Sequence, residues 1–259
     1  MRVWAIANQK GGVGKTTTTL ALGRAMVARG LRVLLVDLDP HASLTRAFGI
    51  PTDPPPAGVA DLFATPPSSL ASLMRASPTE GLDYVCAQTA LATLERRSAT
   101  QPGLGLALSQ AITRHTGGHD AILLDCPPTL GLLMVNALAA ADRVIVPTQC
   151  EPLALYGLAG MVRTAEMVER SRQRPLPVSV VPTMYDRRTR IGRETLAQLQ
   201  DEYAGKIWDE AVPVDTQLSN ADALAQQVVN GHPPGRAFSA YGRALDWLLA
   251  EDQALEHAA

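Results

Sequence analysis

The stretch Asn8-Gln9-Lys10-Gly11-Gly12-Val13-Gly14-Lys15-Thr16-Thr17 decides the fold that we predict for this chain. It follows a short apolar run at 3–7 and precedes a pattern typical of an amphipathic helix over 18–28. Strand, glycine-rich turn and helix in this order are typical of a phosphate-binding loop. The glycines let successive backbone N–H groups point inward, and the helix adds its positive N-terminal end to the same cavity. We therefore predict an anion cradle here.

Two side chains of this loop add chemistry to the cradle. Lys15 can place its ammonium on the outer phosphates of a nucleotide, and the Thr16 hydroxyl stands where such loops hold Mg²⁺. Only three of the 23 lysine and arginine residues are lysines, and two of them, Lys10 and Lys15, fall here. A compact ammonium suits this cavity better than a planar guanidinium, which favours nucleotide binding over an ordinary glycine turn. The predicted contacts are Gly11, Gly12, Val13, Gly14, Lys15, Thr16 and Thr17.

Carboxylates follow two further apolar runs. The run at 32–36 leads into Asp37-Leu38-Asp39-Pro40, and a later run ends at Asp125. Ligands of open α/β sheets lie outside the carboxyl ends of the strands, so we expect Asp37 and Asp39 to face the phosphates and Asp125 to orient Mg²⁺ through a water. Residues 41–50 would then form a mobile segment that responds to the third phosphate. The alternative for the first pair is a plain Asp-Pro turn.

Length and composition bound the class of protein. The chain has 259 residues, 46% apolar and 19% charged, which predicts one globular domain over 1–259. A net charge of −2 gives no overall attraction to nucleic acid, so any such binding needs a local patch. Three widely spaced cysteines (Cys86, Cys126 and Cys150) favour small buried side chains over disulfides or a zinc site. No apolar run reaches the roughly 20 residues of a membrane span, so we expect a cytoplasmic protein.

Strand-like and helix-like segments alternate along the rest of the chain. This order predicts an α/β fold of the P-loop NTPase class, with a doubly wound, mostly parallel sheet of about seven or eight strands and helices on both faces. A proline-rich surface connection with one helical turn at 60–62 is expected over 51–67. Further strands are expected at 82–86, 143–148, 178–185 and 207–212, and helices at 89–97, 104–115, 132–140, 153–172, 191–203 and 239–255.

The motifs together resemble the ParA family of partition and positioning ATPases. The strict pattern Gly-x-x-x-x-Gly-Lys-Thr is not met, because its first glycine would fall at Gln9. The form present is the "deviant" one of the ParA/MinD branch, with a second lysine at its start. The resemblance runs from residue 1 to about 225, and the motifs that carry it are Lys-Gly-Gly-Val-Gly-Lys-Thr-Thr (10–17), Val-Asp-Leu-Asp-Pro (36–40), Leu-Leu-Asp-Cys-Pro-Pro-Thr (123–129), Pro-Thr-Gln-Cys-Glu (147–151) and Thr-Met-Tyr-Asp (183–186).

This resemblance implies ATP and Mg²⁺ as cofactors and a role for each site residue. Thr16 and Asp125 would hold the metal with its waters. Asp39 is also expected at the metal, where it would position the attacking water. Lys10 would reach into the nucleotide of a second subunit, so that ATP joins a homodimer and hydrolysis separates it. Lys10, Lys15 and Asp39 are thus the expected catalytic residues. Hydrolysis would be slow unless a ParB-like or other partner stimulates it, and Met184, Pro213 and Val214 would contact the base.

Binding of DNA is less clearly implied. Val214 and Gln217 stand where the family commonly carries arginines. Eight arginines against three acids between residues 163 and 193 form another candidate for nonspecific contact with phosphates. An arginine-rich solvated surface is the equally weighted alternative. The candidate DNA contacts are Arg163, Arg187, Arg188, Arg190 and Arg193.

The cargo of such a switch stays open between several classes. Segregation of a chromosome or plasmid through nonspecific DNA binding is the first expectation, with a nucleoid-associated location. His41 after Asp-Leu-Asp-Pro resembles orphan members that position chemotaxis or flagellar assemblies at cell poles. A MinD-like division-site regulator would need a basic amphipathic C-terminal helix, whereas this chain ends on an acidic one. A small-molecule ligase on the same scaffold would need an acceptor site that the sequence does not reveal.

Overall fold

A computed structural model of the chain describes residues 1–97, 104–172, 174–219 and 235–258. The strands are β1 (Arg2–Ile6), β2 (Val33–Asp37), β3 (Arg75–Ala76), β4 (Leu82–Val85), β5 (Ala121–Asp125), β6 (Arg143–Gln149) and β7 (Val178–Thr183). The helices are α1 (Lys15–Val27), α2 (Ser43–Ala47), α3 (Leu70–Leu73), α4 (Ala90–Arg97), α5 (Ala107–Thr113), α6 (Leu132–Ala140), α7 (Pro152–Arg172), α8 (Arg190–Glu202) and α10 (Arg236–Ala258). Short 3₁₀ turns lie at Val59–Phe63, Leu104–Leu106 and Thr216–Ser219.

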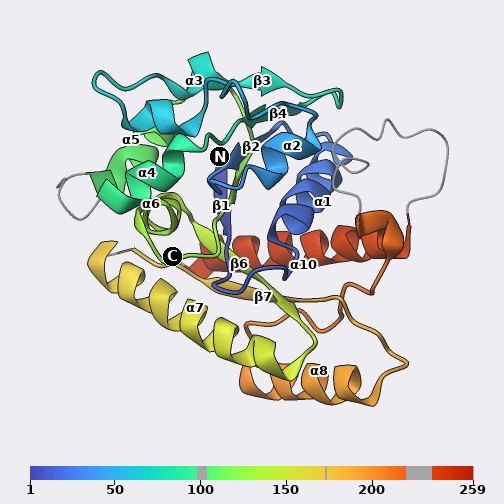
Figure 1. Ribbon diagram of the computed structural model, residues 1–259. Coiled ribbons are helices and arrows are strands. Elements are labelled where there is room, and N and C mark those ends of the chain that lie inside the picture. The colour runs from blue at the N-terminus through green and yellow to red at the C-terminus, as the bar shows by residue number, and fades with distance from the viewer. Residues whose placement is uncertain (98–103, 173, 220–234, 259) are drawn as a thin grey trace.

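The strands form one seven-stranded sheet in the order β3-β4-β2-β5-β1-β6-β7 (Figure 1). Every neighbouring pair is parallel except β3 with β4. Asp125 at the end of β5 lies opposite Ile6 of β1 and opposite Asp37 of β2. The carboxyl ends of three central strands therefore coincide, and the segments that follow them meet at one edge of the sheet.

The side chains of each strand alternate between two apolar layers. In β5, Ile122 and Leu124 join the layer covered by α5, α6, α7 and α8, whereas Leu123 joins the layer covered by α1 and α10. A strand buried on both faces needs a continuous apolar run, which is what residues 121–124 supply. Figure 1 shows the helices on the two sides of the sheet. The predicted α/β fold with helices on both faces is thereby confirmed.

The C-terminal helix α10 is part of the core. Its Asp252 accepts hydrogen bonds from Trp4 Nε1 (3.2 Å) and Arg143 Nε (2.8 Å), and Arg143 is only 1% exposed. Tyr241 of the same helix shares a 2.8 Å hydrogen bond with the Thr18 hydroxyl of α1. Burial raises the pKa of Tyr241 to about 12, so its phenol stays neutral. In the described part of the chain, no helix combines the length and the apolar character needed to span a membrane.

Several predicted elements differ in detail. The strand expected at 207–212 is wrong, because only isolated bridges join Ile207 to Val180 and Pro213 to Tyr185. The exposed pair Asp209-Glu210 interrupts the apolar run there and turns the chain outward. The two-residue β3 was not predicted, since so short a strand carries no periodic signal. A short helix, α2, occupies the segment that we expected to be mobile. The three cysteines are free and buried, as predicted.

Candidate nucleotide site

The glycine-rich loop connects β1 to α1 at the edge where the three strand ends meet. Gly12 and Gly14 have φ angles of 75° and 91°, in the left-handed region where a side chain is strained. Gly14 caps α1, so the helix begins at Lys15, three residues before the predicted start. A Cβ built on Gly11 or Gly12 would meet nothing within 4 Å, because both residues face open space. The loop is thus a concave backbone surface at a helix N-terminus, which suits an anion.

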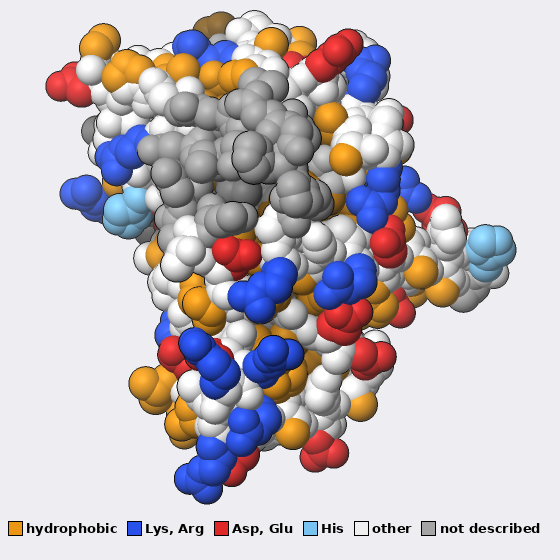
Figure 2. All heavy atoms as spheres, turned by 90° about the vertical axis from the view of Figure 1, so that its right-hand side faces the viewer, with side chains coloured by type: hydrophobic (Ala, Val, Ile, Leu, Met, Phe, Trp, Pro, Cys, Tyr) orange, Lys and Arg blue, Asp and Glu red, His pale blue; other side chains and the backbone are white. Residues whose placement is uncertain are grey.

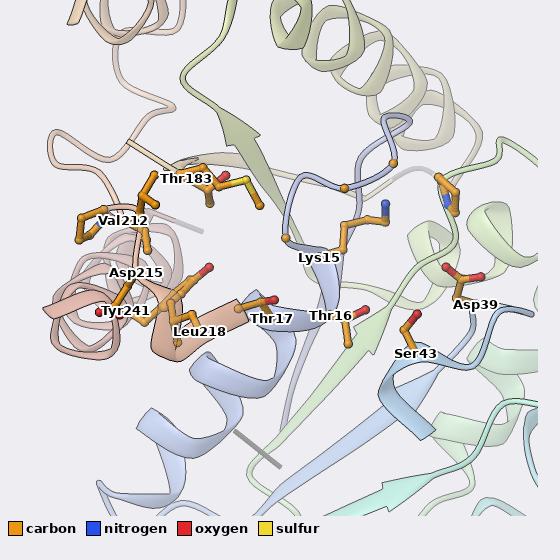
Figure 3. A pocket seen from close by; sticks show the side chains of 17 residues that line it. Lys15, Thr16, Thr17, Asp39, Ser43, Thr183, Val212, Asp215, Leu218 and Tyr241 are labelled. Carbon is orange, nitrogen blue, oxygen red and sulfur yellow. The ribbon is translucent and has the colours of Figure 1, made fainter. Parts of the chain in front are cut away.

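The space over the loop is a cavity of about 440 Å³. Figure 3 shows Lys15, Thr16, Asp39 and Ser43 on one side of it and Thr183, Val212, Asp215, Leu218 and Tyr241 on the other. Of the predicted loop contacts, only Val13 lies outside its lining. That side chain is fully buried, and its carbonyl accepts a 3.1 Å hydrogen bond from Thr183. The cavity has a size suited to a small ligand such as a nucleotide.

Thr16 and Asp125 are in direct contact at the floor of the cavity. The Thr16 hydroxyl donates a 2.7 Å hydrogen bond to Asp125 Oδ2. Asp125 is 1% exposed, and burial raises its pKa well above the usual value, with the neighbouring Asp37 adding to this and the Thr16 hydrogen bond opposing it. A hydroxyl beside a buried carboxylate is a hard oxygen set, so these two residues fit Mg²⁺.

Lys15 is the cation closest in sequence to this pair. Its ammonium donates a 3.1 Å hydrogen bond to the Lys10 carbonyl, and Figure 3 shows it pointing into the cavity between the loop and Asp39. Burial lowers the pKa of Lys15, while the charges of Asp125 and Asp39 oppose that change. A partly desolvated ammonium interacts more strongly with an anion than one in water does. Lys15 is therefore placed to bind the phosphates of a ligand in the cradle.

The prediction that Asp37 faces the phosphates is wrong. Its side chain is fully buried, and its Oδ2 accepts hydrogen bonds from the Thr45 backbone N–H (2.8 Å) and hydroxyl (2.7 Å). The Thr45 hydroxyl in turn accepts a 2.8 Å hydrogen bond from the Ala87 N–H. Burial raises the pKa of Asp37 to about 7, although the Thr45 donors oppose this. Asp37 thus anchors α2 to the ends of two strands.

Asp39 lies on the cavity wall, with its side chain 13% exposed. Its backbone N–H is held by Asp37 Oδ1 at 3.1 Å. Its own Oδ1 accepts hydrogen bonds from the N–H and from Nδ1 of His41, both at 2.9 Å. Asp39 is therefore brought to the same cavity as Lys15 and Thr16, from a different strand end.

Lys10 lies at the rim of the loop and contacts its own chain. Its ammonium donates a 2.7 Å hydrogen bond to Gln149 Oε1 and is 3.6 Å from the Glu151 carboxylate. The Gln149 amide also donates to the Gly12 carbonyl (3.1 Å) and to the sulfur of Met184 (3.0 Å). Our sequence reasoning gave Gln149 no role in the site, although it belongs to a motif that carries the family resemblance.

The far end of the cavity contains the three residues predicted to contact the base, Met184, Pro213 and Val214. Met184 has a φ of 52°, a strained conformation that is common at ligand sites. Tyr241, Asp215 and Leu218 also line this end and were not predicted. Tyr241 lies far from any motif, whereas Asp215 and Leu218 lie beside Val214 and Gln217 and were given no role. Thr183 and Val212 could have been predicted. Thr183 lies at the carboxyl end of a strand, as the segment with Asp39 does, and Val212 directly precedes Pro213.

The arginine candidates do not form one group. Arg187, Arg188, Arg190 and Arg193 are exposed on the first turn of α8 and the loop before it, and we call them the α8 arginine cluster. Arg188 pairs with Asp186 at 2.8 Å and Arg190 with Glu194 at 3.4 Å, so acids partly neutralise the cluster. Arg163 lies on α7 and acts electrostatically on Tyr203, after the other end of this 13-residue helix. A helix of 13 residues is about 20 Å long, so Arg163 lies nearer the end of α8 that is opposite the cluster.

These features define a P-loop nucleotide-binding protein. They are a phosphate cradle at the end of β1, a hydroxyl and a carboxylate for a metal, and a further carboxylate from a third strand end. Comparisons narrow this class. The sequence model of the family described as "AAA domain" matches residues 1–178. The chain is 34% identical to the sporulation initiation inhibitor protein Soj of Bacillus subtilis over 93% of its length and 95% of that protein. It is 38% identical to the chromosome partitioning protein ParA of Caulobacter vibrioides, over 88% of this chain and 86% of that protein. The chain belongs to the ParA family of P-loop ATPases.

Solved structures agree with this assignment. A Mycobacterium smegmatis protein described as cobyrinic acid a,c-diamide synthase, with bound ADP and magnesium, superposes with a TM-score of 0.83 at 32% identity, covering 98% of this chain and 96% of that one. McdA from Cyanothece without nucleotide shares the fold, with a TM-score of 0.81 at 19% identity over 95% of this chain and 99% of that one.

Proposed function

We propose that this protein binds and hydrolyses Mg²⁺–ATP, and that ATP joins two copies into a dimer that segregates or positions a cargo inside the cell. The observation that carries the proposal is the contact between Thr16 and Asp125, 2.7 Å long, beneath the cavity that Lys15 and Asp39 also line. Relatives named for chromosome partitioning in Caulobacter and Thermus support the cargo class.

The residues of this chain divide the work as follows. Loop amides and Lys15 bind and orient the phosphates, and Thr16 with Asp125 holds the metal. Mg²⁺ supplies positive charge that neutralises the phosphate oxygens during transfer. Asp39 accepts a hydrogen bond from the attacking water and aligns it. Of the three strand-end carboxylates, Asp37, Asp39 and Asp125, it is the one that is partly exposed and lies on the cavity wall. Lys10 releases Gln149 and contacts the nucleotide of the second subunit.

Nonspecific DNA is the proposed surface on which the dimer acts. The α8 arginine cluster supports this, because four exposed arginines lie at or just before the N-terminal end of α8. Figure 2 shows Lys and Arg side chains gathered at the end of the molecule where Figure 1 places α8. Arg172 and Arg174 contribute less, since they donate hydrogen bonds to carbonyls at the end of α6.

The test is release of inorganic phosphate from ATP by the pure protein, with magnesium, with and without double-stranded DNA. We expect slow turnover in the wild type and none in Lys15→Ala. Equal phosphate release from the two proteins would overturn the proposal. If the protein hydrolyses ATP but its ATP-bound form does not bind DNA, a protein cargo, such as a chemotaxis or flagellar assembly, is favoured over DNA.

A further inference from the structure

Asp39 holds its carboxylate in one orientation through its neighbour His41. Two donors of His41, the backbone N–H and the ring Nδ1, both reach the same oxygen, Oδ1, at 2.9 Å. Among the described residues, Oδ2 of Asp39 has no hydrogen-bond partner. One oxygen is thus fixed and the other is left available on the cavity wall, which is the arrangement a water-positioning carboxylate needs.

The turn that carries these two residues is otherwise constrained. The Ala42 N–H donates a 2.8 Å hydrogen bond to the Asp39 carbonyl, and Ala42 has a φ of 55°. An alanine in the left-handed region is strained by about 1–2 kcal/mol, so the surrounding contacts must hold the turn. The His41 ring is not required for burial, because its side chain is 79% exposed. Within the described parts of the chain, the hydrogen bond of the His41 ring goes to Asp39.

We propose that His41 is a positioning residue for the water-aligning carboxylate of Asp39. The inference rests on the function proposed above. His41 donates from Nδ1 to Oδ1 and so holds the carboxylate plane with Oδ2 toward the attacking water.

The geometry also determines which ring nitrogen carries the hydrogen. An ionised carboxylate only accepts hydrogen bonds, so Nδ1 must be the protonated nitrogen of neutral His41. Nitrogen-15 NMR of the nucleotide-free protein, under conditions in which the spectrum itself shows a neutral ring, reads this directly. We expect the Nδ1–H form for His41, and its loss in Asp39→Ala. A signal from the Nε2–H form in the wild type would overturn the inference without reference to catalysis.

Kinetics test the consequence with three variants. His41→Ala removes the ring donor, and we expect kcat for ATP to fall about five- to tenfold with KM changed less than about twofold, which corresponds to the loss of one ordinary, solvent-exposed hydrogen bond. His41→Asn restores a nitrogen at the position of Nδ1 and should recover kcat to within about twofold of the wild type. Ala42→Gly relaxes the same turn without touching the donor, and should leave kcat within about twofold.

The outcomes separate this inference from the proposed function. A wild type that hydrolyses no more ATP than Lys15→Ala refutes the function, and the positioning role falls with it. An active wild type with an equally active His41→Ala refutes the positioning role alone. So does an Asn variant that is as slow as Ala, or an Ala42→Gly variant that is as slow as His41→Ala, since either result means that the ring acts only on the turn.

Discussion

The Thr16 hydroxyl and the Asp125 carboxylate meet through a 2.7 Å hydrogen bond although 109 residues separate them in the sequence. The contact joins the first turn of α1 to the end of β5, and every proposed step at the phosphates depends on it. Asp125 is buried and Thr16 is half-buried, so we expect a change in either residue to alter metal binding.

Asp125→Asn should weaken ATP binding in magnesium by at least about tenfold, because a neutral amide holds the metal and its waters less well than a carboxylate. Calorimetric titration with magnesium and then with EDTA measures this. Without metal the wild type and the variant should bind ATP equally weakly. The matched control is Asp209→Asn, which removes an exposed carboxylate that does not line the cavity. An unchanged affinity in Asp125→Asn would remove the metal role of this residue.

The three lysines give an internally controlled series for dimer formation. In an Asp39→Ala background, which should trap the ATP-bound dimer, we expect light scattering to report a dimer with ATP. Lys15→Ala should abolish both ATP binding and the dimer. Lys10→Ala should keep the ATP affinity within about threefold of the background but lose the dimer, because the Lys10 ammonium contacts the nucleotide of the second subunit. Lys206→Ala, at an exposed site, should behave as the background does. A dimer that survives Lys10→Ala contradicts the role given to Lys10.

Asp252→Ala should be strongly destabilising, although it lies far from the nucleotide. It leaves the guanidinium of Arg143, 1% exposed, without its ion pair at 2.7 Å and frees the Trp4 indole N–H. Loss of one partner of a buried pair costs about 3–5 kcal/mol. Urea unfolding checks this against Glu256→Ala, which removes an exposed acid from the same helix and should change stability by less than about 0.5 kcal/mol.

Reversing charge in the α8 arginine cluster should reduce retention on DNA in the presence of ATP. The double change Arg187→Glu and Arg190→Glu should lower affinity for double-stranded DNA by at least about tenfold and flatten its dependence on salt. ATP hydrolysis without DNA should be unaffected. Arg114→Glu, an exposed charge reversal at the C-terminal end of α5, is the control. Equal loss in the control would mean that net charge, rather than this cluster, attracts DNA.

Local chemistry made the phosphate end of the site predictable. Glycines at fixed spacing, a lysine and threonine at a helix start, and carboxylates after apolar runs each have a physical reason that can be read without coordinates. Asp37 was misplaced because the two aspartates after β2 look equivalent in sequence, and only the Thr45 donors on α2 show which one turns inward. Tyr241 was out of reach, because it joins the cavity through packing of α10 on α1.

The most direct test of the central claim is a crystal structure of the protein with magnesium and a non-hydrolysable ATP analogue. We predict that the phosphates lie within hydrogen-bond distance of the backbone N–H groups of residues 12–17 and of Lys15, that the metal lies against the Thr16 hydroxyl beside Asp125, and that the base lies between Met184 and Pro213. A nucleotide bound elsewhere, or phosphates that leave the glycine loop without contacts, would contradict the account.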